Sequence, residues 1–249
     1  MNRQFIVTKL MGRCGNQFYQ IATGFAYAKK HDLAFFVTSE AQNDFGNANY
    51  FRNFPTRDLA GNIYSERVND KGCPYYADIP KMPNGLLIGF WQSFKYFDDY
   101  RQDVLDAFQI PYSKTDLVSI HVRRGDYLNH KDVFPPLSLE YYQTAVKYMN
   151  DKGYFNFLVF SDDIEYCKSV FTDENFDVFN KFLYSEGCTE LEDLSKMSSC
   201  RNNILANSSF GFVASWLNQN PDKIVVCPKY ENMFQGCNVD MIPESYIQL

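Results

Sequence analysis

The feature that most constrains the fold of this chain is the alternation of apolar runs and amphipathic stretches after residue 117. The run Leu117–Val122 has the length and composition of a buried strand. Pro135, Pro136 and Ser138 introduce a predicted helix that stops near Gly153. Further strands are predicted at 155–160, 182–184 and 223–227, with helices between them. Strands that alternate with helices in this way are typical of α/β proteins with a parallel sheet.

The first part of the chain shows a similar pattern. A predicted strand at 5–10 leads into a glycine-containing turn, 11–17, and then into a helix whose apolar positions run from Phe18 to Ala28. Strands are also predicted at 33–37 and 86–91, and a helix leads to Phe108. Residues 40–85 are rich in Asn, Asp, Gly and Pro, which predicts loops with short helices.

We therefore predict two Rossmann-like halves that face each other across a cleft. The segment 110–115 is the best candidate boundary, so the predicted domains are 1–112 and 113–249. In open α/β sheets, ligands bind outside the carboxyl ends of the strands. Candidate functional residues should therefore lie in the loops that follow the strands.

Composition excludes some classes of function. The 249 residues carry a net charge of −6, which argues against a general nucleic-acid-binding surface. An anionic ligand would therefore need a local basic site. Aromatic residues reach 17%, and they could either line a sugar-binding cleft or fill the core.

The cysteines indicate a reducing compartment. There are seven, spread along the chain without a CxxC pair, which argues against a disulfide framework or a zinc site. No apolar run is long enough to span a membrane, and Met1–Phe5 shows no signal-peptide hydrophobic region. We expect a cytoplasmic protein; peripheral association with a membrane and the oligomeric state stay open.

The segment His121–Tyr127 is the strongest candidate for a functional site. Two adjacent arginines, Arg123 and Arg124, follow a predicted buried strand, and a guanidinium group can bind phosphate oxygens in a bidentate manner. The alternative is structural: Arg124 and Asp126 would form a surface ion pair and His121 would be a core histidine. The strand-end position favours an anion site. An integrin-type reading of Arg124-Gly125-Asp126 does not fit a cytosolic chain.

This segment resembles the His-x-Arg-Arg-x-Asp motif of the α1,2-fucosyltransferases, glycosyltransferase family 11. Three further segments resemble motifs of this family in the same order, and the Gly-Asn-Gln loop is also similar to that of protein O-fucosyltransferases, which share the superfamily. These segments are Gly12–Phe18, Phe160–Asp163 and Asn207–Phe210. The first departs from the family pattern at Met11, where a glycine is usual, and the third has Ser209 where Thr is usual.

The resemblance implies a GT-B-type fold and inverting, metal-independent transfer from GDP-β-L-fucose. Domain 1–112 would bind the acceptor and domain 113–249 the donor. Arg123 would contact the β-phosphate and stabilise the leaving group. The other residues that the resemblance places at the substrates are Gly12, Gly15, His121, Arg124, Asp162, Ser208, Ser209 and Phe210. For each glycine the alternative is an ordinary tight turn, and for Asp162 it is helix capping.

The catalytic base stays open. Asp126 is a candidate, although it could instead orient the arginines, and Asn16 lies where related enzymes place a polar group beside the acceptor. A reaction with little base assistance is a third option. We expect no metal and no cofactor, because the chain has no Asp-x-Asp and because His31 and His130 lack partners at ligand spacing.

The leading hypothesis is therefore transfer of fucose to galactose O2 of a glycan. One alternative is a fucosyltransferase that acts on a protein Ser/Thr hydroxyl or on another sugar. Another is an inactive homologue that only binds the sugar nucleotide, because the chain is short for the family and two motifs depart from its pattern. A Rossmann-type oxidoreductase is the least favoured hypothesis, since Gly12-x-x-Gly15 lacks the full GxGxxG motif.

Overall fold

A computed structural model describes residues 3–39, 49–59, 64, 66–70, 76–235, 237 and 239–249 of the chain. The chain forms two units, each described by itself below. Unit 1 comprises Met1–Gln109 and Gly236–Met241, and unit 2 comprises Ile110–Gln235 and Ile242–Leu249. The chain therefore passes between the units three times, at 109–110, 235–236 and 241–242.

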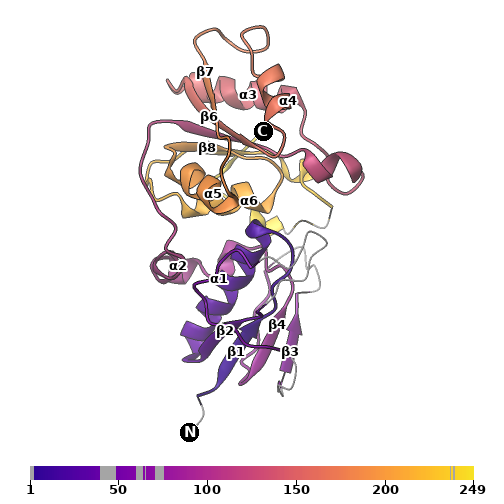
Figure 1. The fold of residues 1–249 in the computed structure, drawn as a ribbon, viewed down its shortest axis with the longest axis vertical. Coiled ribbons are helices and arrows are strands. Elements are labelled where there is room, and N and C mark those ends of the chain that lie inside the picture. The colour runs from indigo at the N-terminus through magenta and orange to yellow at the C-terminus, as the bar shows by residue number, and fades with distance from the viewer. Residues whose placement is uncertain are drawn as a thin grey trace. The chain divides into compact units, whose positions relative to one another are not determined.

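Unit 1 is built on a parallel four-stranded sheet in the order β2-β1-β4-β3 (Figure 1). Helix α1 follows β1 and packs on β1 and β2, and its inward residues include the fully buried Phe18 and Ile21. The elements of unit 1 are β1 (Phe5–Thr8), α1 (Cys14–His31), β2 (Ala34–Val37), β3 (Glu66–Asn69), β4 (Gly85–Ile88), η1 (Phe94–Tyr96), η2 (Asp98–Tyr100), α2 (Arg101–Phe108) and η5 (Val239–Met241).

The segment that returns late in the sequence is tied into unit 1 through Asp240. The carboxylate of Asp240 accepts a hydrogen bond from the backbone N–H of Tyr76 at 2.5 Å and forms an ion pair with Lys95. Its backbone carbonyl lies 3.5 Å from the Ser93 hydroxyl. Unit 1 is thus not contiguous in sequence.

Unit 2 contains a parallel six-stranded sheet in the order β10-β9-β8-β5-β6-β7. Counted within the unit, its first strand lies beside its fourth, which is the Rossmann strand order, and β5 and β8 flank the point where the order reverses. The elements are β5 (Val118–Val122), η3 (Gly125–Asn129), α3 (Leu139–Asn150), β6 (Asn156–Ser161), α4 (Ile164–Val170), β7 (Lys181–Tyr184), α5 (Glu190–Ser199), β8 (Asn202–Ile204), α6 (Ser209–Leu217), β9 (Val225–Cys227), η4 (Tyr230–Asn232) and β10 (Ile247–Gln248).

Helices cover both faces of this sheet, as a doubly wound fold requires. Helices α3 and α4 lie on one face, and α5 and α6 pack together on the other (Figure 1). All five residues of β5 are buried, as expected for a central strand covered on both sides. On the α3 face, Val146 and Met149 pack with Ile120 and Phe157 in one apolar core.

The expected fold class, parallel α/β in two Rossmann-like units, is confirmed. Three strands escaped prediction. They are β3, whose sequence Glu-Arg-Val-Asn is mostly polar as edge strands often are, β8, which has only three residues, two of them asparagines, and β10, which has only two residues. The short helices expected within 40–85 are absent from the described residues 49–59, 64, 66–70 and 76–85; the rest of that region lies outside the described residues.

Candidate active site

The guanidinium group of Arg123 is held at the carboxyl end of β5 by two carboxylates. Nη1 donates to Asp162 Oδ2 at 2.5 Å, and Nη2 donates to Asp126 Oδ1. The ring of Tyr127 lies 5.1 Å from the guanidinium carbon, and only 13% of the Arg123 side chain is exposed. Arg123 is therefore fixed in orientation before any ligand arrives.

Asp162 connects the ends of two neighbouring strands. It follows β6, and besides Arg123 it accepts the backbone N–H of Arg124 at 3.0 Å through Oδ1. A Cβ at Gly125 would lie 2.4 Å from Asp162 Oδ2, so the close approach requires glycine there. The helix-capping alternative for Asp162 is wrong, because Asp163 caps α4 by accepting the N–H of Tyr166 at 3.2 Å.

The second arginine is paired as well. Arg124 Nε donates to Asp163 Oδ2 at 3.2 Å, and its guanidinium carbon lies 3.4 Å from the centre of the Tyr166 ring. Two guanidinium groups thus face three carboxylates, those of Asp126, Asp162 and Asp163. This cluster carries one net negative charge, so a phosphate that binds here must replace a carboxylate at an arginine.

The loop between β8 and α6 packs against this cluster from the other side of the strand-order reversal. The hydroxyl of Tyr127 donates to the backbone carbonyl of Asn207 at 3.2 Å. Helix α6 begins at Ser209 with Ser208 as its N-cap residue, and no side chain caps it. The N–H groups in the first turn of a helix suit an anion.

His121 lies between these two loops. Its ring centre is 5.6 Å from that of Phe210, and a Cβ at Gly211 would lie 2.8 Å from its Nδ1. The imidazole is 5% exposed, and within the described residues Nδ1 has no hydrogen-bond partner. Burial, reinforced by the charge of Arg123, lowers the pKa of His121 to about 4, so the ring is neutral at physiological pH.

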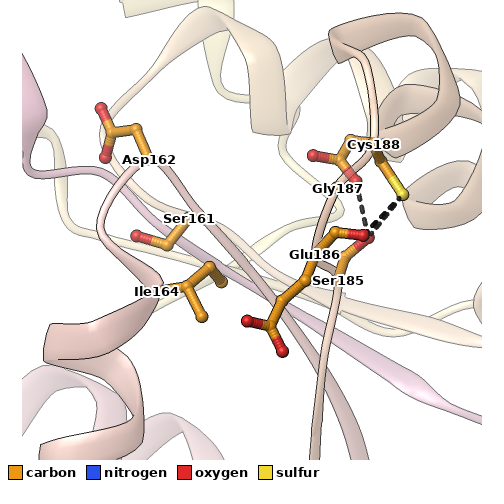
Figure 2. Close-up of a pocket in the computed structure, with 8 residues that line it drawn as sticks. Ser161, Asp162, Ile164, Ser185, Glu186, Gly187 and Cys188 are labelled. Carbon is orange, nitrogen blue, oxygen red and sulfur yellow. Dashed lines mark hydrogen bonds between the residues drawn. The ribbon is translucent and has the colours of Figure 1, made fainter.

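A hollow of about 320 Å³ opens beside the cluster, at the carboxyl ends of β6 and β7 (Figure 2). The Ser185 hydroxyl donates to Asp193 Oδ1 at 2.6 Å, and burial raises the pKa of the Asp193 carboxyl. Most of the wall of this hollow is polar. The lining residues are Ser161, Asp162, Ile164, Ser185, Glu186, Gly187, Cys188 and Asp193.

Unit 1 holds the remaining predicted residues in the loop after β1. Gly12 has a φ of 69°, and a Cβ there would lie 2.4 Å from Asn16 Nδ2, so the turn requires glycine. The tight-turn alternative is wrong for Gly15, which lies in the first turn of α1, because this helix begins at Cys14 rather than after residue 17. The Asn16 Oδ1 accepts a hydrogen bond from Gln92 Nε2 at 2.9 Å.

Amide side chains hold the loop of unit 1. Gln20 bonds both backbone groups of Met11, with Oε1 accepting from N at 2.9 Å and Nε2 donating to O at 3.1 Å. Gln17 Nε2 donates to the carbonyl of Gly12 at 3.0 Å.

Unit 2 thus brings together most of the residues that the sequence singled out, while the glycines and Asn16 belong to unit 1. The residues assembled in unit 2 are His121, Arg123, Arg124, Asp126, Asp162, Ser208, Ser209 and Phe210. No site role was predicted for Asp163, Tyr166, Asp193 or Gln92. Asp163 belongs to the segment Phe160–Asp163 that resembles a family motif, so a signal for it was present in the sequence; Asp193 and Gln92 lie in no motif that was recognised.

Other kinds of site can be checked against the same described residues. No group of three or more His, Cys, Asp or Glu side chains among them could hold a metal ion. None of the helices in the described ranges combines the length and apolar character needed to cross a bilayer. All six cysteines that the structure describes are free thiols, and Cys73 lies outside those residues.

Comparison with known proteins gives both a family and a fold. The model of the family described as "Glycosyl transferase family 11" matches residues 74–238. The O-antigen biosynthesis glycosyltransferase WbnK of Escherichia coli is 33% identical over 193 residues, which cover 68% of this chain and 62% of WbnK, so the chain spans less than two thirds of that relative. An alpha-1,2-colitosyltransferase of Escherichia coli is 27% identical over 295 aligned residues, covering 98% of both proteins.

Among solved structures, NodZ alpha-1,6-fucosyltransferase of Bradyrhizobium, soaked with GDP-fucose, shares the fold with a TM-score of 0.54. The match covers 93% of this chain and 97% of NodZ at 14% sequence identity. At that identity the likeness concerns the fold alone. The GT-B-type fold class agrees with the two parallel α/β units described above.

Proposed function

The chain belongs to glycosyl transferase family 11, as its four motifs indicated, and on this premise we propose that it transfers L-fucose from GDP-β-L-fucose to a glycan. The acceptor atom is galactose O2, the reaction inverts the anomeric carbon, and no metal takes part. The observation that carries the proposal is Arg123, fixed by two carboxylates where the strand order of unit 2 reverses.

The diphosphate would bind between Arg123 and the start of α6. Because both guanidinium groups are already ion-paired, a phosphate oxygen takes the place of Asp126 at Nη2, while Asp162 continues to hold Nη1. Ser208, Ser209 and the backbone N–H groups of the first turn of α6 supply further donors. Arg123 then stabilises the charge that develops on GDP as the bond to fucose breaks.

The nucleoside would occupy the hollow at the ends of β6 and β7. Its volume lies at the lower end of the range for small-molecule sites, which is about 300–1,000 Å³. Carboxylate and hydroxyl oxygens of Asp193, Glu186 and Ser185 accept hydrogen bonds, and the N–H groups of guanine and the hydroxyls of ribose donate them. Asp162 borders both this hollow and Arg123, so one continuous site would hold the whole donor.

The roles of the other predicted residues follow from their state. His121 is a neutral imidazole and takes part through hydrogen bonding rather than charge, and Arg124 shapes the loop through Asp163 and Tyr166. Released from Arg123 by the phosphate, Asp126 is the carboxylate that can receive the acceptor proton. Asn16, Gly12 and Gly15 serve the acceptor, and Asn16 binds rather than deprotonates it.

The test is transfer from GDP-fucose to a panel of lactose, N-acetyllactosamine and a folded protein acceptor, with the linkage read by NMR. A fucosyl group at galactose O2, formed equally in EDTA, is the expected result. Loss of activity in EDTA would overturn metal independence, and fucosylation of the protein acceptor alone would overturn the glycan assignment. Tight GDP binding with neither transfer nor donor hydrolysis would indicate an inactive homologue.

A second donor is favoured by one observation, the relative named alpha-1,2-colitosyltransferase, which matches along nearly its whole length. Colitose is fucose without the hydroxyl at carbon 3, so both sugars present the same anomeric centre to Arg123. Measuring kcat/KM for GDP-fucose and GDP-colitose side by side distinguishes the two. A higher value for GDP-colitose would replace the proposed donor and leave the proposed chemistry intact.

A further inference from the structure

The loop after β4 in unit 1, residues 89–93, is held in a conformation that costs free energy. Gly89 has a φ of 140°, and a Cβ there would lie 2.3 Å from the Cβ of Asp70. Trp91 has a φ of 55°, a region that bulky residues rarely adopt. The Asp70 carboxylate fixes the turn by accepting the backbone N–H of Trp91 at 2.7 Å.

A second feature of Trp91 is also unfavourable in free energy. Trp91 is 3% exposed and packs in the apolar core of unit 1, yet its Nε1 is buried without a hydrogen-bond partner among the described residues. Buried indole N–H groups are normally bonded. Backbone strain together with an unsatisfied donor at one position is typical of loops whose shape serves a function.

The loop sets the two neighbours of Trp91 in different environments. Phe90 is left 42% exposed, although the residues on either side of it, Gly89 and Trp91, are buried. Gln92 instead reaches the loop after β1, where its Nε2 donates to Asn16 Oδ1 at 2.9 Å. Strands β1 and β4 are neighbours in the sheet, so these loops leave the same edge.

An exposed aromatic ring and amide side chains on the loops of two neighbouring strands suit a neutral, polyhydroxylated ligand. The C–H face of a pyranose packs on a ring, and amides bond its hydroxyls without the desolvation cost of a charge. In the loop after β1, Gln17 and Gln20 bond backbone atoms and Gln92 bonds Asn16.

We propose that Phe90 is the ring on which the acceptor sugar stacks, and that Gln92 is a positioning residue that fixes the amide of Asn16. The proposal rests on the proposed function and specifies its acceptor side. It assigns acceptor affinity to the loops after β1 and β4 and leaves donor affinity to unit 2.

The first experiment compares Phe90→Ala and Phe90→Trp with wild type, using Phe179→Ala, at a position 72% exposed in unit 2, as the matched control. We expect Phe90→Ala to raise the KM for the acceptor about tenfold, the order of one lost ring contact. Phe90→Trp and Phe179→Ala should stay within twofold. The KM for GDP-fucose and its hydrolysis without acceptor should not change. An unchanged acceptor KM in Phe90→Ala would overturn the stacking role.

Binding of N-acetyllactosamine, measured by saturation-transfer NMR, separates the failure of this inference from failure of the proposed function. If wild type binds the sugar and Phe90→Ala does not, the stacking role of Phe90 is supported even where no fucose is transferred. If both proteins bind the sugar equally, the stacking role is wrong whatever the enzyme activity.

The role of Gln92 is tested by Gln92→Leu, which removes the donor, and Gln92→Lys, which offers another donor at similar reach. We expect the leucine variant to raise the acceptor KM about fivefold, as for a lost neutral hydrogen bond, with the donor KM unchanged. The lysine variant should recover most of this loss. Equal effects in the two variants would show that the bond to Asn16 does not position the amide.

Discussion

The loops after β5 and after β1 occupy corresponding places in two parallel sheets, but they are built from different chemistry. In unit 2, the loop is held by ion pairs from Arg123 and Arg124 to three aspartates. In unit 1, it is held by hydrogen bonds from glutamine side chains to the backbone. Each of these two loops follows the first strand of its unit. In both sheets the strand order reverses beside that first strand.

The difference indicates how a two-substrate reaction can be divided. Ion-paired arginines can exchange a carboxylate for a phosphate and keep an anionic partner, so the loop of unit 2 suits an anionic donor. Amides pair as readily with hydroxyl groups as with each other, so the loop of unit 1 suits a neutral sugar. Substitutions on the two sides should therefore separate cleanly in their effects.

The largest expected effect is that of a substitution in the ion-paired loop after β5. Arg123→Lys keeps the charge and removes the fork that binds both carboxylates, so turnover should fall about 100- to 1,000-fold, as for loss of a preorganised donor to a developing anion. Transfer assays measure this, and circular dichroism checks folding. Arg201→Lys, a surface substitution in the same unit, should keep its activity. Near-native turnover in Arg123→Lys would remove this residue from the donor site.

The second effect concerns pH. His121 has a pKa of about 4 when folded and an ordinary value of 6.5 when unfolded, so the unfolded state binds a proton first as the pH falls. Stability is full above pH 6.5 and should drop by up to about 3 kcal/mol as the pH falls to 4. Urea unfolding at several pH values measures this. His121→Gln should flatten the dependence of the free energy of unfolding on pH, whereas His130→Gln should not. The same pH dependence in His121→Gln and wild type would contradict the burial of a neutral ring at position 121.

The third prediction tests the loop after β1, which glutamine side chains hold. Gln20→Leu leaves both backbone groups of Met11 without their partner, which should lower the free energy of unfolding by about 1–3 kcal/mol. Gln102→Leu, on the exposed side of α2, should change it by less than about 0.5 kcal/mol. GDP affinity, measured by calorimetry, should be unchanged in both variants. Weaker GDP binding in Gln20→Leu would break the division between the units.

The smallest expected effect concerns the ion pair between Asp126 and Arg123. If phosphate replaces this carboxylate at Arg123, Asp126→Asn should tighten GDP binding several-fold, because the carboxylate no longer competes for the guanidinium group; this corresponds to about 1 kcal/mol for the partly buried ion pair. Calorimetry gives the affinity, and Asp132→Asn is the control on the same loop. A loss of kcat above 100-fold, with the basic limb of the pH profile altered, would assign Asp126 as the base that proton transfer requires.

The parts of the site that could be predicted are those encoded in contiguous sequence. The strand at 118–122 and the arginines after it were visible because the buried run and the charges are adjacent. The bond from Arg123 to Asp162 was not, because it depends on β5 and β6 being neighbours. For the same reason the need for glycine at position 125 shows only once Asp162 is in place.

The hollow beside the cluster was beyond sequence reasoning. Its walls come from the ends of β6 and β7 and from α5, and Asp193 follows a capping box that predicts a helix and nothing more. The link between Gln92 and Asn16 joins loops 76 residues apart in the chain. Such pairs follow from the order of strands in a sheet, which local periodicity does not encode.

The discontinuity of unit 1 has a consequence for biosynthesis. Asp240, which bonds Tyr76 and Lys95, leaves the ribosome after the whole main segment of unit 2. Domains generally fold as they are synthesised, from the N-terminus onward. Unit 1, whose synthesis starts first, is therefore completed only after the main segment of unit 2 has been made. A chain that stops at Gln235 would contain the main segment of unit 2 but would lack Asp240, whose carboxylate bonds Tyr76 and Lys95.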